Sequence, residues 1–227
     1  MLKLNAPENF GLRQVDILEP LGAASESIAL YTAWKEARAH SVERGQAKDF
    51  DVVIATELNE PAPGAAAVVT IDSVAGAAGR SGGLRFGALL HGILRDSELT
   101  AGREQVQDLA QMHGKLLDAS GAEIEAAVDA VVATLQHPLL RRATAAERCH
   151  RELPLLLPLG DGRTLEGIVD LAFLEKGEWT VVDFKTDPEL SASQARYERQ
   201  VQWYVHALSK LTGLPAKGVI LWIHITI

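Results

Sequence analysis

Two aspartates and a lysine have the residue types and the spacing of a hydrolytic metal site. Asp170 and Asp183 lie in strand-like runs on either side of the turn-like tetrad Glu175-Lys-Gly-Glu178. A symmetric hairpin closed at this tetrad places the two aspartates opposite each other. Their Cβ atoms would be about 4.5–5.5 Å apart, so the carboxylates repel unless a cation lies between them. A divalent metal ion would supply that charge, and strand alternation directs Lys185 to the same face as Asp183.

The residues around these acids are apolar on both faces of each predicted strand, which is typical of a sheet covered on both sides. They are Ile168, Val169, Leu171, Phe173, Val181, Val182 and Phe184. A buried carboxylate that lacks a partner destabilises the fold by several kcal/mol. A purely structural role is therefore the weaker explanation of Asp170 and Asp183.

These residues resemble those of the metal-dependent nucleases that carry the PD-(D/E)xK motif. Within that superfamily they resemble the RecB/AddA-type nuclease domain of bacterial helicase-nucleases. The similarity covers roughly residues 80–210, with several independent motifs in the expected order. Beyond the hairpin it includes Phe86-Gly-Ala-Leu-Leu-His91, Ile124–Leu140 with its His-Pro-Leu-Leu ending, Arg151-Glu-Leu-Pro154 and Tyr197-x-x-Gln200-x-x-x-Tyr204.

The resemblance implies a metal centre with a catalytic lysine. Asp170 and Asp183 would be metal ligands, with the backbone carbonyl of Phe184 as a further oxygen. Hard oxygen ligands suit Mg²⁺ or Mn²⁺, and an imidazole ligand from His91 would favour Mn²⁺. Lys185 would orient the attacking water and stabilise negative charge in the transition state. His91 taken without the motif is more typical of an ordinary helix histidine than of a metal ligand.

Three further polar positions have roles only through the resemblance. Glu152 would help to order metal-bound water, although it also fits an edge-strand charge. Gln200 and Tyr204 would position DNA and the active-site strands, together with Tyr197 on the same helix face. The alternative for the two tyrosines is an aromatic core stripe, which explains the glutamine less well.

Several arginines offer a second route to DNA. Arg141, Arg142 and Arg151 gather with Arg148 just ahead of Glu152, and they indicate either a solvated helix end or a track for phosphates. Arg95 stands where many relatives have a glutamate, four residues after the histidine. The role of that glutamate is therefore open in this chain.

The overall composition limits the function classes. The 227 residues carry a formal net charge of −8, which argues against a free-standing nucleic-acid binder. A helicase partner or a missing helicase domain would then supply the affinity for DNA. A single cysteine, Cys149, excludes an internal disulfide and a four-cysteine iron–sulfur cluster. The absence of GxxxxGK[ST] argues against ATP hydrolysis, and the lack of an apolar span or signal core predicts a cytoplasmic location without a membrane contact.

The hydrophobic pattern predicts an α/β fold of the restriction-endonuclease-like type, a mixed sheet with an antiparallel meander flanked by helices. Predicted helices cover 85–94, 101–119, 122–135 and 191–211, the last with Ser191 as N-cap and Gly213 near its end. Predicted strands cover 151–159, 165–174, 178–185 and 218–225, with a turn at Asp161-Gly162.

Residues 1–80 are predicted to form a separate segment. It would contain a helix over 25–46, short strands near 50–55 and 65–71, and a flexible Gly/Ala/Ser link over 76–83. By position it resembles a remnant of a helicase–nuclease junction, and residues 81–227 would then be the nuclease domain.

The sequence therefore predicts a Mg²⁺- or Mn²⁺-dependent deoxyribonuclease, taken as an exonuclease, acting with a helicase in recombination and double-strand break repair. One alternative is a catalytically silent nuclease-like scaffold that binds DNA or a helicase. Another is a nuclease for RNA or for a single-stranded end. The choice between exo and endo action stays open at this level.

Overall fold

The computed structural model describes residues 21–46, 51–64, 69–78, 83–186 and 190–226. The chain divides into two compact units, Met1–Asp49 and Phe50–Ile227. The first residues of two predicted strands (50 and 65–68) and part of the predicted link (79–82) lie outside the described residues. None of the described helices is both long and apolar enough to cross a membrane.

The first unit contains one described helix, α1 (Leu21–Gln46). It confirms the helix predicted over 25–46. The larger apolar side chains of α1 are exposed: Ile28, Leu30, Tyr31, Trp34 and Val42.

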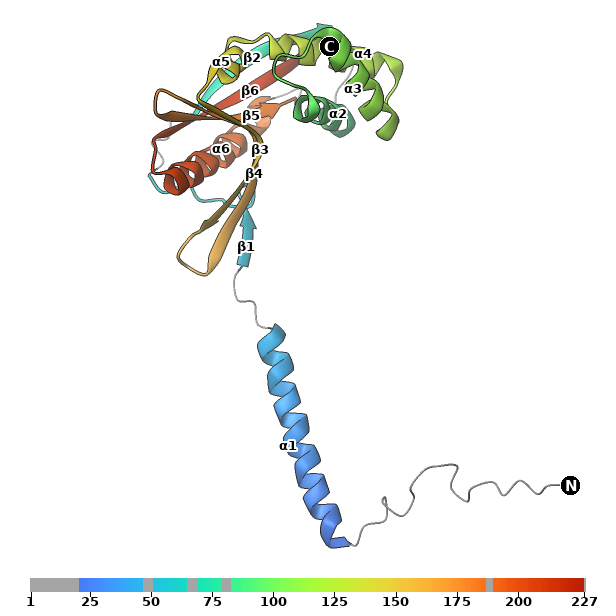
Figure 1. Ribbon diagram of the computed structural model, residues 1–227, viewed down its shortest axis with the longest axis vertical. Coiled ribbons are helices and arrows are strands. Elements are labelled where there is room, and N and C mark those ends of the chain that lie inside the picture. The colour runs from blue at the N-terminus through green and yellow to red at the C-terminus, as the bar shows by residue number, and fades with distance from the viewer. Residues whose placement is uncertain (1–20, 47–50, 65–68, 79–82, 187–189, 227) are drawn as a thin grey trace, which may run out of the picture. The chain divides into compact units, whose positions relative to one another are not determined.

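The second unit is built on a six-stranded mixed sheet (Figure 1). Its strands are β1 (Asp51–Ile54), β2 (Val69–Ala78), β3 (Arg148–Pro158), β4 (Arg163–Glu175), β5 (Glu178–Lys185) and β6 (Ala216–Thr226). The order is β1-β4-β5-β6-β2, and β3 pairs with β4 on its other side. Strands β3, β4 and β5 form the predicted antiparallel meander, whereas β1, β6 and β2 join through parallel pairs.

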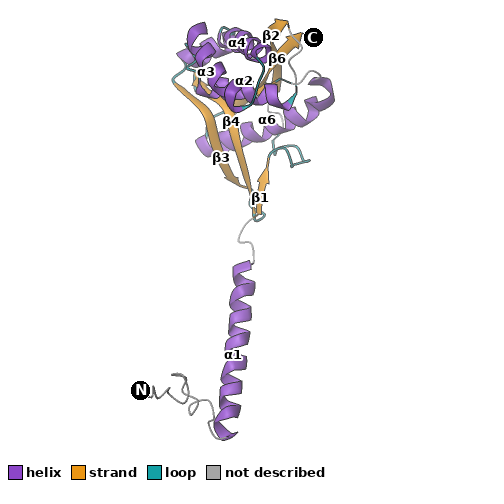
Figure 2. Ribbon diagram, turned by 90° about the vertical axis from the view of Figure 1, so that its right-hand side faces the viewer, coloured by secondary structure: helices purple, strands orange, loops and turns teal. Residues whose placement is uncertain are grey.

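Helices lie on both faces of this sheet (Figures 1 and 2). They are α2 (Leu84–Asp96), α3 (Arg103–Leu116), α4 (Gly121–Leu135), α5 (Pro138–Ala145) and α6 (Leu190–Thr212). One core joins α2–α5 to the sheet through side chains such as Phe86, Leu171 and Phe173. A second core joins α6 to the opposite face through Val169 and Val181, among others. The predicted fold class is confirmed, and the predicted cover on both sides holds for the part of the sheet that these two cores contact.

The β4–β5 hairpin has the predicted register, with Leu171 paired to Val182 and Glu175 to Glu178. Its two turn residues, Lys176 and Gly177, have φ angles of 53° and 76°. Positive φ at both central positions is the type I′ geometry that matches the twist of a hairpin. The glycine adopts this conformation without steric cost, so the turn sets the register of the strands that bear the aspartates.

One helix was not predicted, and two local predictions need correction. The segment after His137 forms a separate helix, α5, because His137 accepts a hydrogen bond from the Leu139 N–H and Pro138 occupies the first helical position. Ser191 is not the N-cap of α6, since that helix begins at Leu190. The predicted flexible link is also wrong at its start, because β2 continues to Ala78.

The compact unit begins earlier than the predicted boundary at residue 80. Strand β1 pairs with β4, and β2 pairs with β6 as far as Ala78 opposite Thr226. Residues 76–78, Gly-Ala-Ala, have little local preference for a strand, and their pairing with the distant strand β6 makes them part of β2. The interpretation of residues 1–80 as part of a helicase–nuclease junction stays a prediction.

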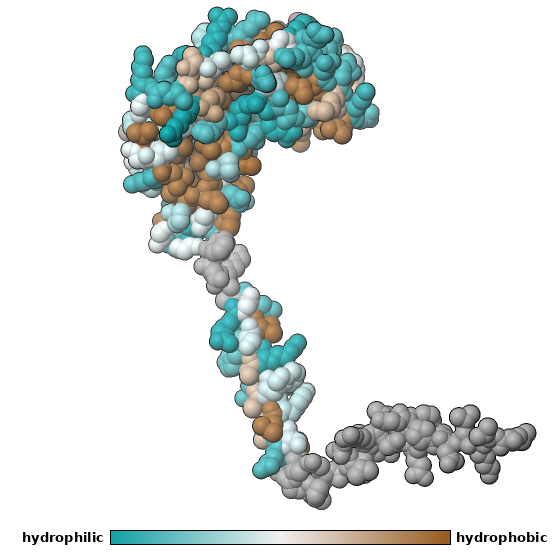
Figure 3. Space-filling view, in the orientation of Figure 1, coloured by the Kyte–Doolittle hydropathy of each residue, from teal (hydrophilic) through white to brown (hydrophobic). Residues whose placement is uncertain are grey.

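Part of the sheet is covered on one face only. The exposed apolar side chains there are Val52, Ile54, Leu156 and Ile168, on β1, β3 and β4. Figure 3 shows hydrophobic surface over this part of the domain.

Candidate active site

Asp170 lies at a gap in the sheet. One edge of β4 pairs with β1 over residues 163–166 and with β5 over residues 171–175, so the four residues between them have neither neighbour. The Asp170 carboxylate fills part of this gap, because its Oδ2 accepts a hydrogen bond of 2.8 Å from the Phe184 backbone N–H. A side chain here replaces a strand partner, which satisfies a buried backbone donor.

The alternation of side chains between the two faces of the sheet is interrupted at Asp170 of β4. Leu153 and Val169 pack toward α6, but Leu171, two residues beyond Val169, packs in the core on the other face. Regular alternation would place Val169 and Leu171 on one face. This interruption coincides with Glu152 on β3, which lies across from Asp170 in the register of β3 and β4. The φ angle of Glu152 is 49°. Such a conformation is uncommon for a residue with a side chain and tends to occur at functional sites.

Asp183 and Lys185 belong to the layer of α6. Lys185 Nζ lies 2.7 Å from Asp183 Oδ2, and both side chains are largely buried. The ammonium also donates to Gln200 Oε1 at 3.4 Å and lies 4.5 Å from the centre of the Tyr197 ring. Gln200 in turn donates a 3.0 Å hydrogen bond to the Tyr204 hydroxyl. The structure thus joins the predicted lysine, glutamine and tyrosines in one network.

Tyr204 reaches this network only because residue 167 is a glycine. A Cβ atom at Gly167 would lie 2.4 Å from Cε1 of the Tyr204 ring. Tyr204 and Tyr197 are buried, with 6% and 7% of their surfaces exposed. Their burial suits them to holding Lys185, and it leaves little ring surface for DNA.

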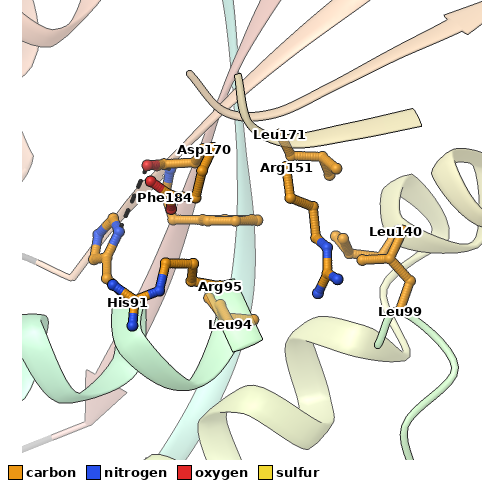
Figure 4. Close-up of a pocket in the computed structure, with 10 residues that line it drawn as sticks. His91, Leu94, Arg95, Leu99, Leu140, Arg151, Asp170, Leu171 and Phe184 are labelled. Carbon is orange, nitrogen blue, oxygen red and sulfur yellow. Dashed lines mark hydrogen bonds and ion pairs between the residues drawn. The ribbon is translucent and has the colours of Figure 1, made fainter. Parts of the chain in front are cut away.

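His91 approaches the site from α2. Its Nδ1 lies 3.7 Å from Asp170 Oδ1, the contact drawn in Figure 4. Asp170 therefore contacts His91 of α2 and Asp183 contacts Lys185, while the two carboxylates lie close enough for Asp183 to raise the pKa of Asp170. His91 also separates two hollows. A cavity of about 10 Å³ lies toward Glu152 and Arg95, and an open groove of about 370 Å³ lies toward Lys185.

The groove is walled by small residues of α2, including Gly87 and Ala88, and by the end of β5 with Lys185 and Thr186. A Cβ atom at Gly87 would lie 3.0 Å from the Thr186 hydroxyl. The absence of a side chain therefore lets α2 and the end of β5 approach closely. The groove leads directly to His91 and Lys185.

The titrating groups are perturbed by burial and by one another. Burial raises the pKa of Asp170, and the nearby Asp183 raises it further. Burial also raises the pKa of Asp183, while Lys185 opposes that rise. Burial lowers the pKa of Lys185, but the attraction of Asp183 outweighs this effect and the pKa is raised overall. The ammonium therefore stays protonated at neutral pH.

The donor set fits a divalent cation in type. Asp183 Oδ2 is fully buried and accepts no well-aligned hydrogen bond, although Lys185 is close. Burial lowers the pKa of His91, against the opposing effect of Asp183, and so favours the neutral imidazole that a metal ligand requires. In the part of the chain that is described, no three His, Cys, Asp or Glu side chains are assembled in metal-binding geometry.

The arginines predicted to bind DNA are partly engaged within the protein. Arg142 pairs with Glu175 at 2.8 Å and lies over the Phe173 ring. Arg151 donates to the Ser97 carbonyl at the end of α2. Arg141 is exposed, and no described residue forms an ion pair with it. A continuous phosphate track is therefore not preformed.

Sequence reasoning missed a cluster beside the site, Arg95 with Asp96 and His113. Arg95 donates to both oxygens of Asp96, at 2.8 and 3.1 Å, and Asp96 Oδ2 lies 2.7 Å from His113 Nε2. His113 comes from α3, far along the chain, and its spacing from the other two residues gives no local signal.

Comparison with known proteins agrees with this geometry. The family model described as the PD-(D/E)XK nuclease superfamily matches residues 73–225. An ATP-dependent helicase/nuclease protein of Alkaliphilus oremlandii is 26% identical over 157 residues, which are 60% of this chain and 13% of that protein. Its counterpart of the same name in Acetivibrio thermocellus is 29% identical over 154 residues, covering 58% and 12%. The counterpart in Clostridium kluyveri is 32% identical over 76 residues, covering 33% and 6%.

The chain spans only about an eighth of the length of the first two relatives. The family match, in contrast, includes α2 with His91, all three strands of the meander, and α6 with Gln200 and Tyr204. The chain therefore belongs to the PD-(D/E)XK nuclease superfamily and is a nuclease domain of the RecB/AddA type.

Proposed function

We propose that this domain is a metal-dependent deoxyribonuclease that acts as an exonuclease, together with a helicase, in recombination and double-strand break repair. The observation that supports catalysis most directly is the buried Asp183–Lys185 pair next to Asp170. A charged pair in this position is costly to bury. It is joined to Gln200 and is reached through an open groove, as a reaction centre requires.

Asp170, Asp183, the Phe184 carbonyl and His91 would hold a Mg²⁺ or Mn²⁺ ion, which would activate water and offset the charge of the phosphate. Lys185 has a separate task. Its ammonium remains protonated and donates to the scissile phosphate, where it stabilises negative charge as the water attacks. Gln200 and Tyr197 keep the ammonium in place, so little reorganisation is needed during the reaction.

Glu152 would orient the attacking water. Its left-handed backbone conformation places it at the row of Asp170, beside the small cavity shared with His91. That cavity, at about 10 Å³, has room for about one water molecule. The strand to be cut would enter through the larger groove on the Lys185 side.

The test is a cleavage assay with linear and circular DNA, single- and double-stranded, in Mg²⁺, Mn²⁺ or EDTA. We expect metal-dependent cutting that Asp183→Asn abolishes and that Asp108→Asn, an exposed control on α3, leaves unchanged. Cleavage of linear DNA, with circular DNA left intact, would support exonuclease action. Labels at the DNA ends would give its polarity. Undiminished cleavage by Asp183→Asn, or in EDTA, would contradict the proposal.

The same assay separates the main alternative. DNA binding without cleavage in any metal would favour a silent scaffold, the second function considered from the sequence. Preferential cleavage of RNA would change the substrate and keep the mechanism.

A further inference from the structure

The cluster of Arg95, Asp96 and His113 holds one guanidinium in a defined direction. Arg95 binds the Asp96 carboxylate through Nε and Nη2, and His113 binds the same carboxylate from α3. The His113 side chain is buried, with 9% exposed. A fork of two hydrogen bonds fixes the plane of an arginine far better than a single contact does.

Two features indicate that the cluster is more than a chance surface pair. Asp96 is the last residue of α2, where a carboxylate is unfavourable because the helix dipole is negative at that end. The His113 ring lies so close to α2 that a Cβ atom at Gly92 would be 2.9 Å from its Nδ1. The chain therefore accepts an unfavourable acid and a helix glycine to hold Arg95.

Arg95 is held at the edge of the reaction centre. Its side chain lines the small cavity with His91, Glu152 and Asp170, and in Figure 4 it runs along α2 toward His91. Half of the side chain is exposed, 51%, so the guanidinium is open to solvent. Its Nη1 donates to no residue in the described part of the chain, whereas the other arginine of this cavity, Arg151, is committed to the Ser97 carbonyl.

We propose that Arg95 binds a phosphate of the substrate strand, on the side of His91 opposite Lys185. The proposal rests on the nuclease function above and adds a residue that binds the substrate backbone. The three acids Glu152, Asp170 and Asp183 would repel the negatively charged DNA strand, so cations on both sides of them are needed. Lys185 supplies one from the groove, and Arg95 supplies the other from the end of α2. Asp96 and His113 are positioning residues that act through Arg95.

The test measures binding separately from catalysis. Fluorescence anisotropy of a labelled single-stranded oligonucleotide is followed over a range of NaCl concentrations in EDTA, with every variant in the Asp183→Asn background. Each phosphate contact to a single strand adds about 0.7 to the slope of log K against log salt. We expect Arg95→Gln to reduce the slope by about that amount and to weaken binding by about tenfold.

Arg103→Gln is the matched control. Arg103 is equally exposed, at 53%, and also pairs with acids, Glu125 and Asp129, but it lies on α3 outside the site. We expect its slope to stay unchanged. Arg95→Lys should keep the slope but bind more weakly, because an ammonium lacks the guanidinium fork. Asp96→Asn should weaken binding in the same direction as Arg95→Gln and by less.

Equal effects of Arg95→Gln and Arg103→Gln, or no binding of the oligonucleotide by the parent protein, would overturn the proposal. Its failure can be distinguished from failure of the nuclease function. A wild-type domain that cleaves DNA while Arg95→Gln binds like the control refutes only the role of Arg95. If Arg95→Gln reduces the salt slope but the wild-type domain cleaves no DNA, only the catalytic function is refuted.

Discussion

The two sides of the reaction centre are built differently. On the α6 side, Asp183 and Lys185 are largely buried and linked to Gln200 and Tyr204 by polar contacts. On the α2 side, His91 has 35% of its side chain exposed and Arg95 has 51%. The buried side is fixed before any ligand arrives, whereas the open side is accessible to metal and substrate. This difference suggests that substitutions on the α6 side will affect stability and catalysis together, and those on the α2 side will affect binding.

Lys185→Met should have the largest effect. We expect it to lower the cleavage rate by about 10²–10³-fold, because it removes the donor to the phosphate. It should also destabilise the metal-free protein by about 3–5 kcal/mol, since it leaves Asp183 buried without its partner. Urea unfolding and single-turnover cleavage measure the two effects. Lys217→Met is the control, because its ion pair with Glu178 is partly exposed, at 40% for each side chain, and should contribute about 1 kcal/mol or less.

His91→Ala should weaken Mn²⁺ binding by at least about tenfold and shift the preference away from Mn²⁺, if the imidazole is a ligand. A structural histidine would instead lower thermal stability and leave the titration unchanged. Calorimetric titration of Mn²⁺ into both proteins distinguishes these cases, with His40→Ala on α1 as an exposed control. Equal affinities would remove His91 from the site and weaken the contrast between the two sides.

Gly167→Ala tests whether packing on the α6 side positions the lysine. The new methyl group would collide with the Tyr204 ring. We expect a loss of about 1–3 kcal/mol in unfolding free energy, as for other overpacked cores, together with reduced cleavage. Gly121→Ala in α4, where the added atom meets nothing within 4 Å, should be neutral or slightly stabilising. Unchanged stability and activity in Gly167→Ala would show that Tyr204 moves freely.

The metal-free protein should lose stability as pH rises. Burial raises the pKa of Asp170 to about 8, so between the ordinary carboxyl range and that value the folded state holds more protons than the unfolded state. The unfolding free energy then falls with pH, by at most about 1.4 kcal/mol per pH unit for one proton. Asp170→Asn should flatten this slope and stabilise the apo protein near pH 8. A wild-type profile that rises over the same range would contradict the shifted pKa.

The smallest effect is expected for the predicted phosphate track. At a net charge of −8, the domain alone should bind DNA with a dissociation constant in the micromolar range or weaker at physiological salt. Arg141→Glu/Arg142→Glu should weaken it only a few-fold further, because Arg142 is already paired with Glu175. Nanomolar DNA binding by the domain alone that these substitutions leave unchanged would contradict delivery of the strand by a helicase.

Much of the site could be predicted because its signals are local. The turn at Lys176-Gly177 sets the β4–β5 register, and the two-residue alternation then places Lys185 beside Asp183. Gln200 and Tyr204 share a face because they are one helical turn apart. The strand over 76–78 could not be predicted, because its residues favour no strand until β6 pairs with them.

The sequence by itself determined the hairpin, the long helices and the chemistry of Asp170, Asp183 and Lys185, because each depends on spacing within a short segment. The tertiary structure decided where those groups point. Asp170 accepts from the Phe184 N–H in the gap between β1 and β5 and contacts His91 from α2, while Asp183 pairs with Lys185. The Asp96 carboxylate that binds Arg95 is also held by His113 from another helix. Contacts between distant segments form only when the layers pack, so no local pattern encodes them.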